Sequence, residues 1–495
     1  MTPSQYTPEE PISSIATALA PAALGIVRVS GKGCIELVSK VFSRPKALMA
    51  AAGNTLVYGW IIEYSGHSEI VSGSKIDEVM LAVYRAPKSF TGEDMVEIFC
   101  HGGPAVVMAV QNLMLKIGFR QANRGEYTFR AFINGKTDLT RAEAVKEIID
   151  SHTDTSRSHA AGRLAGALFE EIDSIKKLII DTLAAIEVEI EYPEDEETIA
   201  DSFDRADIET AARRLQALVD SWRGEKLYQD GARVVLAGRT NAGKSSLFNA
   251  ILKEERAIVS DIEGTTRDWL ESWASINGIP VRLFDTAGLR ETSDKIEAQG
   301  VEISRNLVHD ADVVLYLIDG SQGANEEDRA FIENCKEPLI VVYTKADKCG
   351  GDTGAEPPLE GVVEDAVVEP VETTAVGTRG RPSPLTSKIS SKTGAGLAEL
   401  FKAITDLLTA DLGLSGAGST TERTQAGLGS ARQKEAVSAA LESVRHALVS
   451  ADDNYTLDAV VQDLEDALDS LGEVTGDVTP DDVLGSIFAN FCVGK

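Results

Sequence analysis

The segment from Gly238 to Ser245 constrains the fold of this chain more than any other. It reads Gly-Arg-Thr-Asn-Ala-Gly-Lys-Ser and fits the phosphate-binding pattern G-x-x-x-x-G-K-[ST]. The apolar run 233–237 before it is typical of a buried parallel strand, and 246–252 after it reads as a helix. A glycine-rich turn between strand and helix directs backbone N–H groups at an anion. We therefore predict a nucleotide-binding domain in which Lys244 contacts the β- and γ-phosphates and Ser245 binds Mg²⁺.

Three further motifs follow in order and indicate that the base is guanine. Asp285-Thr286-Ala287-Gly288 ends an apolar run, which predicts Asp285 at the Mg²⁺ hydration shell and the Gly288 N–H at the γ-phosphate. Thr344-Lys345-Ala346-Asp347 also follows an apolar run, so Asp347 is expected at the end of a strand. A carboxylate there accepts both guanine N–H groups, and such sites discriminate between bases by roughly 10⁴-fold. Ser390-Ser391-Lys392 completes the series.

The Mg²⁺-sensing loop is expected between the first two motifs, with Thr266 as the second Mg²⁺ hydroxyl. Leu289 follows the second motif, and an apolar side chain cannot orient the attacking water, which leaves the acidic residues Glu291, Asp294 and Glu297 downstream. No arginine finger is evident in the sequence. The predicted GTP contacts are Asn241, Ala242, Gly243, Lys244, Ser245, Ser246, Ser260, Asp261, Ile262, Glu263, Gly264, Thr265, Thr266, Asp285, Thr286, Ala287, Gly288, Thr344, Lys345, Ala346, Asp347, Ser390, Ser391 and Lys392.

Composition narrows the class of protein. A chain of 495 residues predicts two to four domains, and a net charge of −30 disfavours non-specific binding to nucleic acid or anionic membranes. The sequence contains no run of eighteen apolar residues, so we expect no membrane-spanning helix. Residues 1–11 carry no Lys or Arg, which argues against a signal peptide. The five Cys residues are scattered and neither they nor the His residues show metal-ligand spacing, which fits a reducing cytoplasm.

One local stretch departs from the overall acidity. Between Arg120 and Arg141 there are five basic residues against two acids. Two interpretations stay open: the stretch faces an anionic ligand, or it is a solvated surface.

The apolar pattern changes along the chain. Residues 1–118 alternate as an α/β unit, with strands at 25–29 and 78–84 and a helix at 106–117. Residues 119–225 turn helical, including one long helix with apolar residues from Leu164 to Ile190 that Pro193 closes. Residues 226–405 alternate strand and helix, apart from 349–386, which is expected to be a disordered acidic insertion, and 406–495 are helical again. The fold class is therefore multidomain α/β plus all-α, with a Ras-like P-loop domain inserted into a discontinuous helical domain.

Sequence segments in the N-terminal α/β unit, near the start of the first helical region and at the C-terminus resemble those of a known family. They are Ser89 to Asp94 (Ser-Phe-Thr-Gly-Glu-Asp), Gly125 to Lys136 with its Asn-Gly-Lys end, and the terminal Phe491-Cys492-Val493-Gly494-Lys495. With the nucleotide motifs, these segments resemble the tRNA modification GTPase family MnmE, also called TrmE, over essentially the full chain outside 349–386.

The resemblance implies an N-terminal domain that dimerises and binds 5,10-methylene- or 5-formyl-tetrahydrofolate. Arg28, Glu97, Lys136 and Lys495 match the family's folate-contacting positions. Cys492 matches a C-terminal cysteine implicated in the modification, so that Glu297, Lys244 and Cys492 form the expected catalytic set.

The resemblance also implies how GTP is hydrolysed and for what purpose. K⁺ takes the place of an arginine finger, with Asn241, Ser260, Ile262 and Thr265 as its ligands, and Glu297 orients the water. K⁺ also promotes dimerisation of the nucleotide domains. A homodimer is expected to join the flavoprotein MnmG (GidA) in a heterotetramer in the cytoplasm. Together they would add an aminomethyl or carboxymethylaminomethyl group at C5 of the tRNA wobble uridine.

Three rival classes of GTPase fit the sequence less well. A ribosome-assembly or other RNA-associated GTPase needs an RNA-binding module, and no such segment is recognisable in the sequence. A dynamin-like membrane GTPase needs a basic or amphipathic lipid-binding surface, which the composition disfavours. A purely regulatory switch would not explain the folate-matching residues or the terminal Cys492.

Overall fold

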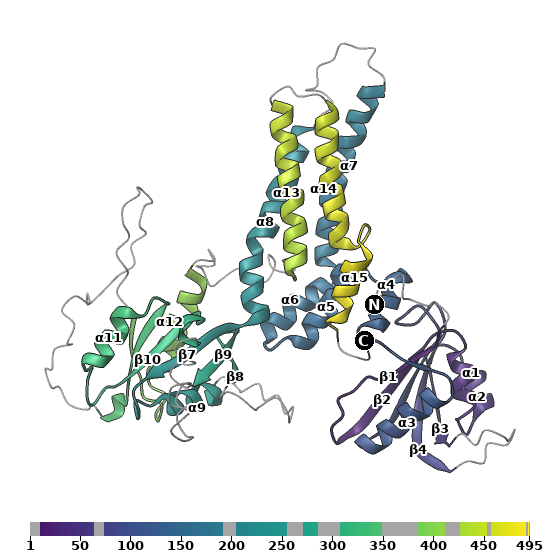
Figure 1. Cartoon of the computed structure of the whole chain (residues 1–495), viewed down its shortest axis with the longest axis horizontal. Helices are drawn as coiled ribbons and strands as arrows, with labels where there is room; N and C mark the ends of the chain where they lie inside the picture. The colour runs from purple at the N-terminus through teal and green to yellow at the C-terminus, as the bar shows by residue number, and fades with distance from the viewer. Residues whose placement is uncertain are drawn as a thin grey trace. The chain divides into compact units, whose positions relative to one another are not determined.

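The chain forms two compact units in a computed structural model (Figure 1). The first unit comprises Met1–Lys146, Gly162–Val219 and Leu428–Lys495, and the second comprises Glu147–Ala161 and Asp220–Gly427. The structure describes residues 10–63, 74–191, 204–254, 271–285, 307–348, 385–410, 426–452, 457–491 and 494. Both units contain segments that are distant in sequence, as a discontinuous helical domain requires.

The first unit begins with a six-stranded sheet of order β3-β4-β5-β2-β1-β6. Its neighbouring strands are antiparallel, except that β1 and β6 are parallel. The strands predicted at 25–29 and 78–84 are confirmed within β2 and β4, and β6 lies just beyond residue 118. The strands are β1 (Ile12–Ile15), β2 (Ala22–Ser30), β3 (Thr55–Ile62), β4 (Lys75–Tyr84), β5 (Met95–Gly102) and β6 (Arg120–Gln121).

Three helices cover one face of this sheet. α1 (Cys34–Ser39), α2 (Pro45–Met49) and α3 (Pro104–Lys116) share one apolar core with the strands, and α3 confirms the helix predicted before Gly118. The opposite face of the sheet leaves large apolar side chains exposed; they are Leu24, Leu56, Tyr58 and Met80. An apolar sheet face without a covering layer is a candidate surface for association.

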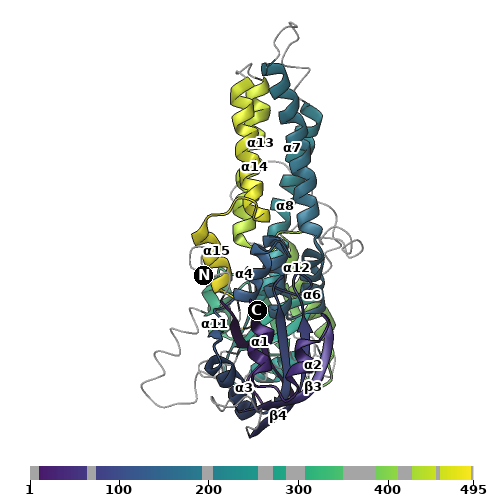
Figure 2. The ribbon, with the colours of Figure 1, turned by 90° about the vertical axis from the view of Figure 1, so that its right-hand side faces the viewer.

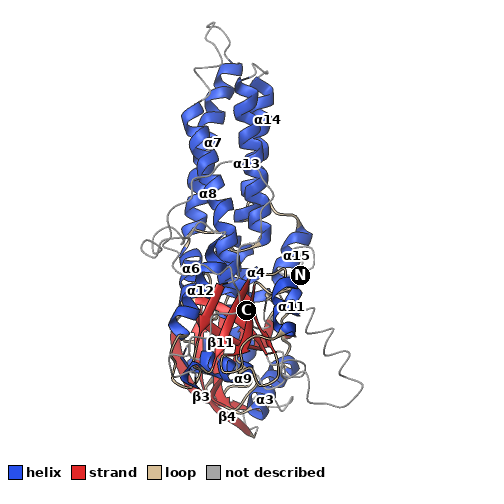
Figure 3. Cartoon of the chain, turned by 90° about the vertical axis from the view of Figure 1, so that its left-hand side faces the viewer, coloured by secondary structure: helices blue, strands red, loops and turns tan. Residues whose placement is uncertain are grey.

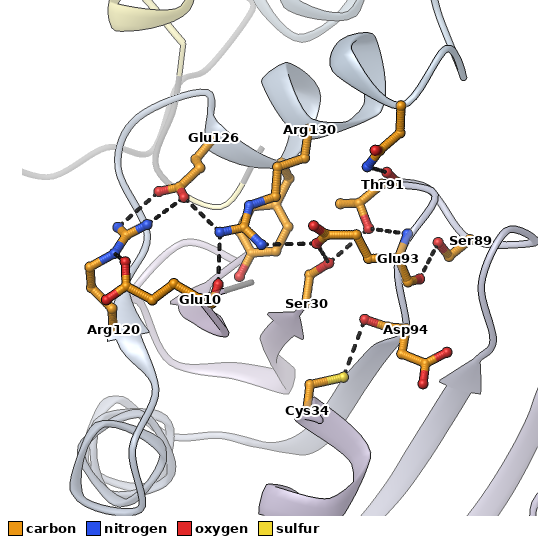
Figure 4. Close-up of polar contacts among 12 residues, drawn as sticks. Glu10, Ser30, Cys34, Ser89, Thr91, Glu93, Asp94, Arg120, Glu126 and Arg130 are labelled. Atoms are coloured by element: carbon orange, nitrogen blue, oxygen red, sulfur yellow. Dashed lines mark hydrogen bonds and ion pairs between the residues drawn. The ribbon is translucent and has the colours of Figure 1, made fainter. Parts of the chain in front are cut away.

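Helix α4 (Glu126–Ile133) is buried and carries an ion-pair network (Figure 4). Arg130 is 0% exposed; its Nη1 lies 2.9 Å from Glu93, and its Nη2 lies 3.0 Å from Glu126 and donates to the Glu10 carbonyl. Arg120 pairs with Glu126 at 2.5 Å and with Glu10 at 2.8 Å. A buried guanidinium is tolerated because carboxylates and a carbonyl replace its hydration.

This network answers the question left open for the basic stretch. Arg120 and Arg130 form ion pairs with carboxylates of the same unit, and Arg141 pairs with Asp138 at 2.9 Å. Arg124 and Lys136 are exposed. Neither interpretation of the stretch as a whole is therefore correct, because most of its charge holds α4 and the neighbouring turn in place.

Long helices make up the rest of the first unit, and α7, α13 and α14 run side by side (Figures 2 and 3). The predicted apolar periods are confirmed, because Ile172, Ile175 and Ile179 on α7 and Val437 and Val444 on α13 are buried. The chain's remaining helices outside the nucleotide sheet are α5 (Leu139–Asp150), α6 (Asp154–Ala165), α7 (Ala167–Glu191), α8 (Arg205–Asp230), α13 (Ala431–Asp452), α14 (Leu457–Thr475) and α15 (Asp481–Ala489).

The prediction of a single long helix from Leu164 to Ile190 is wrong. α6 ends at Ala165 and α7 begins at Ala167, because Gly166 has φ +111°. A Cβ on Gly166 would lie 2.2 Å from Nη2 of Arg141, so the break lets this guanidinium pack against the backbone. The same guanidinium lies 5.2 Å from the centre of the Phe169 ring.

The C-terminal segment packs on α4. The Phe488 ring is 0% exposed and meets Phe129 edge to face, with ring centres 5.3 Å apart. A Cβ on Gly125, which has φ +67°, would lie 2.5 Å from the Phe488 carbonyl oxygen. Gly494 lies against β1, since a Cβ there would lie 2.6 Å from the Ile15 carbonyl oxygen. Gly494 is thereby held at the N-terminal sheet.

The second unit contains a doubly wound sheet of order β12-β11-β10-β7-β9-β8. Neighbours are parallel except β8 and β9, and the phosphate-binding loop follows the central strand β7. The inserted Ras-like P-loop domain is confirmed. Its elements are β7 (Ala232–Gly238), α9 (Lys244–Glu254), β8 (Glu271–Ile276), β9 (Ile279–Asp285), β10 (Val313–Asp319), α11 (Glu326–Asn334), β11 (Leu339–Thr344), η3 (Ala346–Lys348), β12 (Leu385–Lys388) and α12 (Leu397–Thr409).

Two boundaries in this unit differ from expectation. Leu385 and Thr386 belong to β12 and pair with Ile340 and Val341 of β11, so the acidic insertion ends before them. The expected disorder of 349–384 concerns residues outside those described. Asp347 does not end a strand; it lies in the 3₁₀ turn η3 after β11, where the chain turns towards the nucleotide loops.

The buried network predicts a large local loss of stability on removing Arg130. Arg130→Met leaves the Glu93 and Glu126 carboxylates without this partner, and we expect about 3–5 kcal/mol less local stability. Hydrogen exchange in peptides from α4 and β1 measures it. Arg124→Met, on the exposed side of the same stretch, is the matched control and should exchange like the original chain. Equal exchange in both variants would refute the role of the network.

Candidate functional site

The phosphate-binding loop joins β7 to α9 in a conformation that its sequence requires. Gly238 has φ +136°, and a Cβ there would lie 2.4 Å from the Leu317 carbonyl oxygen. Lys244 begins α9, and its Nζ donates to the carbonyl oxygens of Gly238 at 2.7 Å and Arg239 at 2.8 Å. The ammonium group is therefore held at the mouth of the loop by the loop's own backbone. Ser246 follows in the first turn of α9.

Two oxygen-bearing side chains meet beside this lysine. Ser245 Oγ donates to Asp285 Oδ2 at 2.9 Å, and Asp285 is buried at the end of β9. A hydroxyl and a carboxylate on facing elements fit Mg²⁺, which prefers oxygen ligands and is usually bound with substrate phosphates. Among the residues that the structure describes, no group of three or more His, Cys, Asp and Glu side chains could hold a metal by itself.

The predicted base-recognition residues lie together. Ser390 Oγ donates to Asp347 Oδ1 at 2.7 Å, and this hydrogen bond lowers the pKa of Asp347. The Ala346 N–H donates to the Ile389 carbonyl, which joins the two base-recognition segments, and Ser391 and Lys392 follow Ser390. An ionised carboxylate held by a neighbouring hydroxyl keeps acceptor positions for the two guanine N–H groups.

Thr344 and Lys345 connect these base-recognition segments to the phosphate-binding loop. Thr344 Oγ1 donates to the Ala242 carbonyl at 2.7 Å, and Lys345 Nζ donates to the Asn241 carbonyl at 3.1 Å. Lys345 Nζ also pairs with Asp319 at 2.6 Å. Sequence reasoning missed Asp319, although its position at the end of an apolar strand resembles that of Asp285.

Several predicted site residues lie outside the described part of the chain, so their roles stay predictions. Of the predicted K⁺ ligands, only Asn241 is described; its φ is +64°. The residues outside are Ser260, Asp261, Ile262, Glu263, Gly264, Thr265, Thr266, Thr286, Ala287, Gly288, Glu297, Cys492 and Lys495.

A second polar cluster surrounds Arg28 on the open face of the N-terminal sheet. Its Nε and Nη2 both donate to Glu97 Oε1, at 2.9 and 2.7 Å, and its Nη1 donates to the Gly494 carbonyl at 3.0 Å. Tyr84 donates to the other Glu97 oxygen at 3.2 Å, and burial raises the pKa of Tyr84. The structure thus brings Arg28 and Glu97 together with the residue that precedes Lys495.

Lys136 lies beside the loop that borders this cluster. A Cβ on Gly92 would lie 3.2 Å from Lys136 Cγ, and Asn134 Nδ2 donates to the Thr91 carbonyl at 2.7 Å. From the same loop the partly exposed Phe90 ring lies 5.7 Å from the Arg28 guanidinium carbon. Charged groups beside an exposed aromatic ring fit a flat heterocycle with an acidic tail, the chemistry of a folate.

Sequence reasoning missed three aromatic residues around Arg28. Tyr127 donates its hydroxyl to the Arg28 carbonyl at 2.7 Å, and its ring lies 5.6 Å from the guanidinium carbon. Phe90 and Tyr127 were within segments already singled out, so their aromatic character was the available signal. Tyr84 lies at the end of a predicted strand, where the sequence offers no signal of a functional role.

The chain matches two protein-family models. The sequence model described as the MnmE helical domain matches residues 139–492, and that described as the GTP-binding protein TrmE N-terminus matches 11–136. The chain is 48% identical over 497 residues to the tRNA modification GTPase MnmE of Treponema denticola, with 99% of each chain covered. It is 43% identical over 507 residues to that of Treponema pallidum, with 99% of each covered.

Among solved structures, the chain is similar to a variant of Aquifex aeolicus Era bound to GDP and aluminium fluoride. The identity is 25% and the TM-score is 0.25, with 43% of this chain and 66% of the other covered. No helix in the described ranges is long and apolar enough to cross a membrane.

Proposed function

This chain belongs to the MnmE family of tRNA modification GTPases, and we propose that it is the GTP-hydrolysing subunit of an enzyme that modifies C5 of the wobble uridine. Identity of 48% across 99% of a tRNA modification GTPase carries the proposal. The local chemistry supports it, because Lys244, Ser245 and Asp285 meet at the phosphate-binding loop while Asp347 and Ser390 form a base-recognition pair.

The modification itself needs partners that this chain does not supply. We propose that a tetrahydrofolate, as the 5,10-methylene or 5-formyl form, provides the one-carbon unit and that Cys492 acts beside it. A flavoprotein of the MnmG type would complete a cytoplasmic complex that installs the aminomethyl or carboxymethylaminomethyl group. A net charge of −30 suggests that the flavoprotein makes most of the contacts with tRNA phosphates.

The function is tested in a bacterium that lacks its own homologue. We expect this chain to restore the C5-modified wobble uridine, measured by mass spectrometry of tRNA nucleosides, and Lys244→Ala to abolish restoration because the phosphate contact is lost. Arg124→Met, at an exposed position outside both sites, is the control. No restoration even with the native flavoprotein co-expressed would reject the proposal.

We further propose that K⁺ supplies the positive charge that an arginine finger would bring to the transition state and promotes dimerisation of the nucleotide domains. Asn241 is the described member of the expected ligand set, and its side-chain amide oxygen is a ligand of the kind that a hard monovalent cation prefers. Glu297 would orient the water that attacks the γ-phosphorus as the bond to the β–γ bridging oxygen breaks.

This proposal predicts that GTP turns over faster in K⁺ than in Na⁺ at equal ionic strength, measured by phosphate release. Glu297→Ala should lower kcat by about 10²-fold or more, the range seen when a general base is lost, while GTP affinity changes little. Equal rates in the two cations would remove K⁺ from the mechanism, and full turnover by Glu297→Ala would remove Glu297.

We propose that the open face of the N-terminal sheet forms a homodimer interface beside a folate site. Side chains alternate along a strand, so Tyr58, Met80, Phe99 and Ile26 continue across one face, on which Arg28 and Glu97 also lie. Tyr58 is 52% exposed and Met80 is 47% exposed, which is a large apolar area to leave in water.

Two substitutions on this face separate its two roles. Met80→Glu should convert the dimer to a monomer in sedimentation velocity, because it buries a charge in an apolar contact, while Met49→Glu on α2 should not. Arg28→Gln should stay dimeric and lose 5-formyl-tetrahydrofolate binding in calorimetry by about tenfold or more, because a charged hydrogen bond is removed. If the chain without substitutions is a monomer, the dimer proposal is wrong. If Arg28→Gln binds folate as tightly as the original chain, the proposed folate site is wrong.

A further inference from the structure

Asp319 carries a largely buried carboxylate to which the proposed function assigns no role. It ends β10 in register with Thr344 of β11, and its side chain is 10% exposed. Oδ2 accepts from Lys345 Nζ at 2.6 Å, while Oδ1 accepts from the N–H and hydroxyl of Ser321 at 3.0 and 2.6 Å. Both oxygens are thus engaged within the protein, which suits a residue that positions another group.

Asp319 pairs with Lys345, whose backbone conformation is energetically unfavourable. Lys345 has φ +60°, and the carbonyl to which its Nζ donates belongs to Asn241, whose φ is +64°. For lysine the left-handed region costs free energy and persists only where the surroundings impose it, whereas asparagine enters this region more readily. Two such residues, 104 positions apart, are joined by one ammonium group whose charge Asp319 balances.

This contact orients the phosphate-binding loop. Lys345 and Thr344 take hold of the consecutive carbonyls of Asn241 and Ala242. Because a peptide unit is planar and trans, the Lys345 contact with the Asn241 carbonyl fixes the direction of the Ala242 N–H, and the Thr344 contact with the Ala242 carbonyl fixes that of the Gly243 N–H. Backbone N–H groups of such a loop are what bind phosphate, so their direction bears on nucleotide affinity.

We propose that Asp319 is a positioning residue for nucleotide binding, which holds Lys345 against the Asn241 carbonyl and so keeps the phosphate and base segments in register. The inference rests on the nucleotide site proposed above. Neither oxygen of Asp319 is expected to touch the nucleotide; the carboxylate acts through Lys345.

The test is a fluorescent-GDP titration of the nucleotide-free full-length chain. Asp319→Asn removes the charge at constant size, and we expect the Kd for GDP to rise about 10- to 100-fold, the loss of one charge-assisted hydrogen bond. The kcat at saturating GTP should stay within about twofold, because the contact is the same before and in the transition state. Asp319→Glu keeps the charge and should recover most of the affinity.

A double-mutant cycle shows whether the effect passes through Lys345. In a Lys345→Met background Asp319→Asn should change the Kd by less than about twofold, because the ammonium it holds is gone. Ser321→Ala removes the hydroxyl's hydrogen bond to Asp319 Oδ1 but leaves Oδ2 paired with Lys345, so this variant should bind GDP like the original chain, with the thermal midpoint as a check on folding. If Asp319→Asn does not fold, Asp319→Ser, which also removes the charge, takes its place in both backgrounds.

The outcomes separate the two proposals. Unchanged GDP affinity in Asp319→Asn, equal loss in both Lys345 backgrounds, or the same loss in Ser321→Ala each overturn the role of Asp319. Failure of the original chain to bind GDP would instead reject the nucleotide site itself.

Discussion

The first unit depends on the burial of helix α4, whose successive side chains each reach a different part of the chain. Arg130 is held by Glu93 and Glu126, the Tyr127 hydroxyl reaches the Arg28 carbonyl, and Phe129 packs on Phe488 near the C-terminus. A guanidinium without solvent exposure is stable only where carboxylates surround it, so this helix has one acceptable position. That position fixes the N-terminal sheet and the C-terminal segment to one element, and Arg28 meets the Gly494 carbonyl as a result.

The second unit applies the same physical device to a binding loop. Lys345 is a cation in an unfavourable backbone conformation, and Asp319 supplies the opposite charge that keeps it there. In the first unit the charge pairs serve packing, whereas here the pair directs a side chain at a carbonyl of the phosphate-binding loop. The difference lies in exposure: Arg130 is 0% exposed and Lys345 is 31% exposed, so only the second remains near solvent and ligand.

Much of the fold was predictable because it follows from short-range pattern. The strands around 25–29 and 78–84, the helix before Gly118 and the strand–loop–helix at Gly238 all rest on local alternation and turn chemistry. The break at Gly166 was missed, because helical periodicity passes through a single glycine and the Arg141 side chain that fills its place is distant in sequence. The role of the basic stretch is not predictable for the same reason, since two of its partners, Glu10 and Glu93, lie outside it and the burial of Glu126 has no local signal.

The amino-acid pattern alone predicts the nucleotide chemistry and the family, because G-x-x-x-x-G-K-[ST] and its companion motifs place particular side chains at fixed spacing after strands. It also determined that the helical segments flank the nucleotide domain, since their apolar period stops and resumes. Which charges form the ion pairs that hold each unit together is set by the tertiary structure. Ion pairs such as Asp319 with Lys345 and Arg130 with Glu93 join residues whose separation carries no local pattern, and burial sets their role.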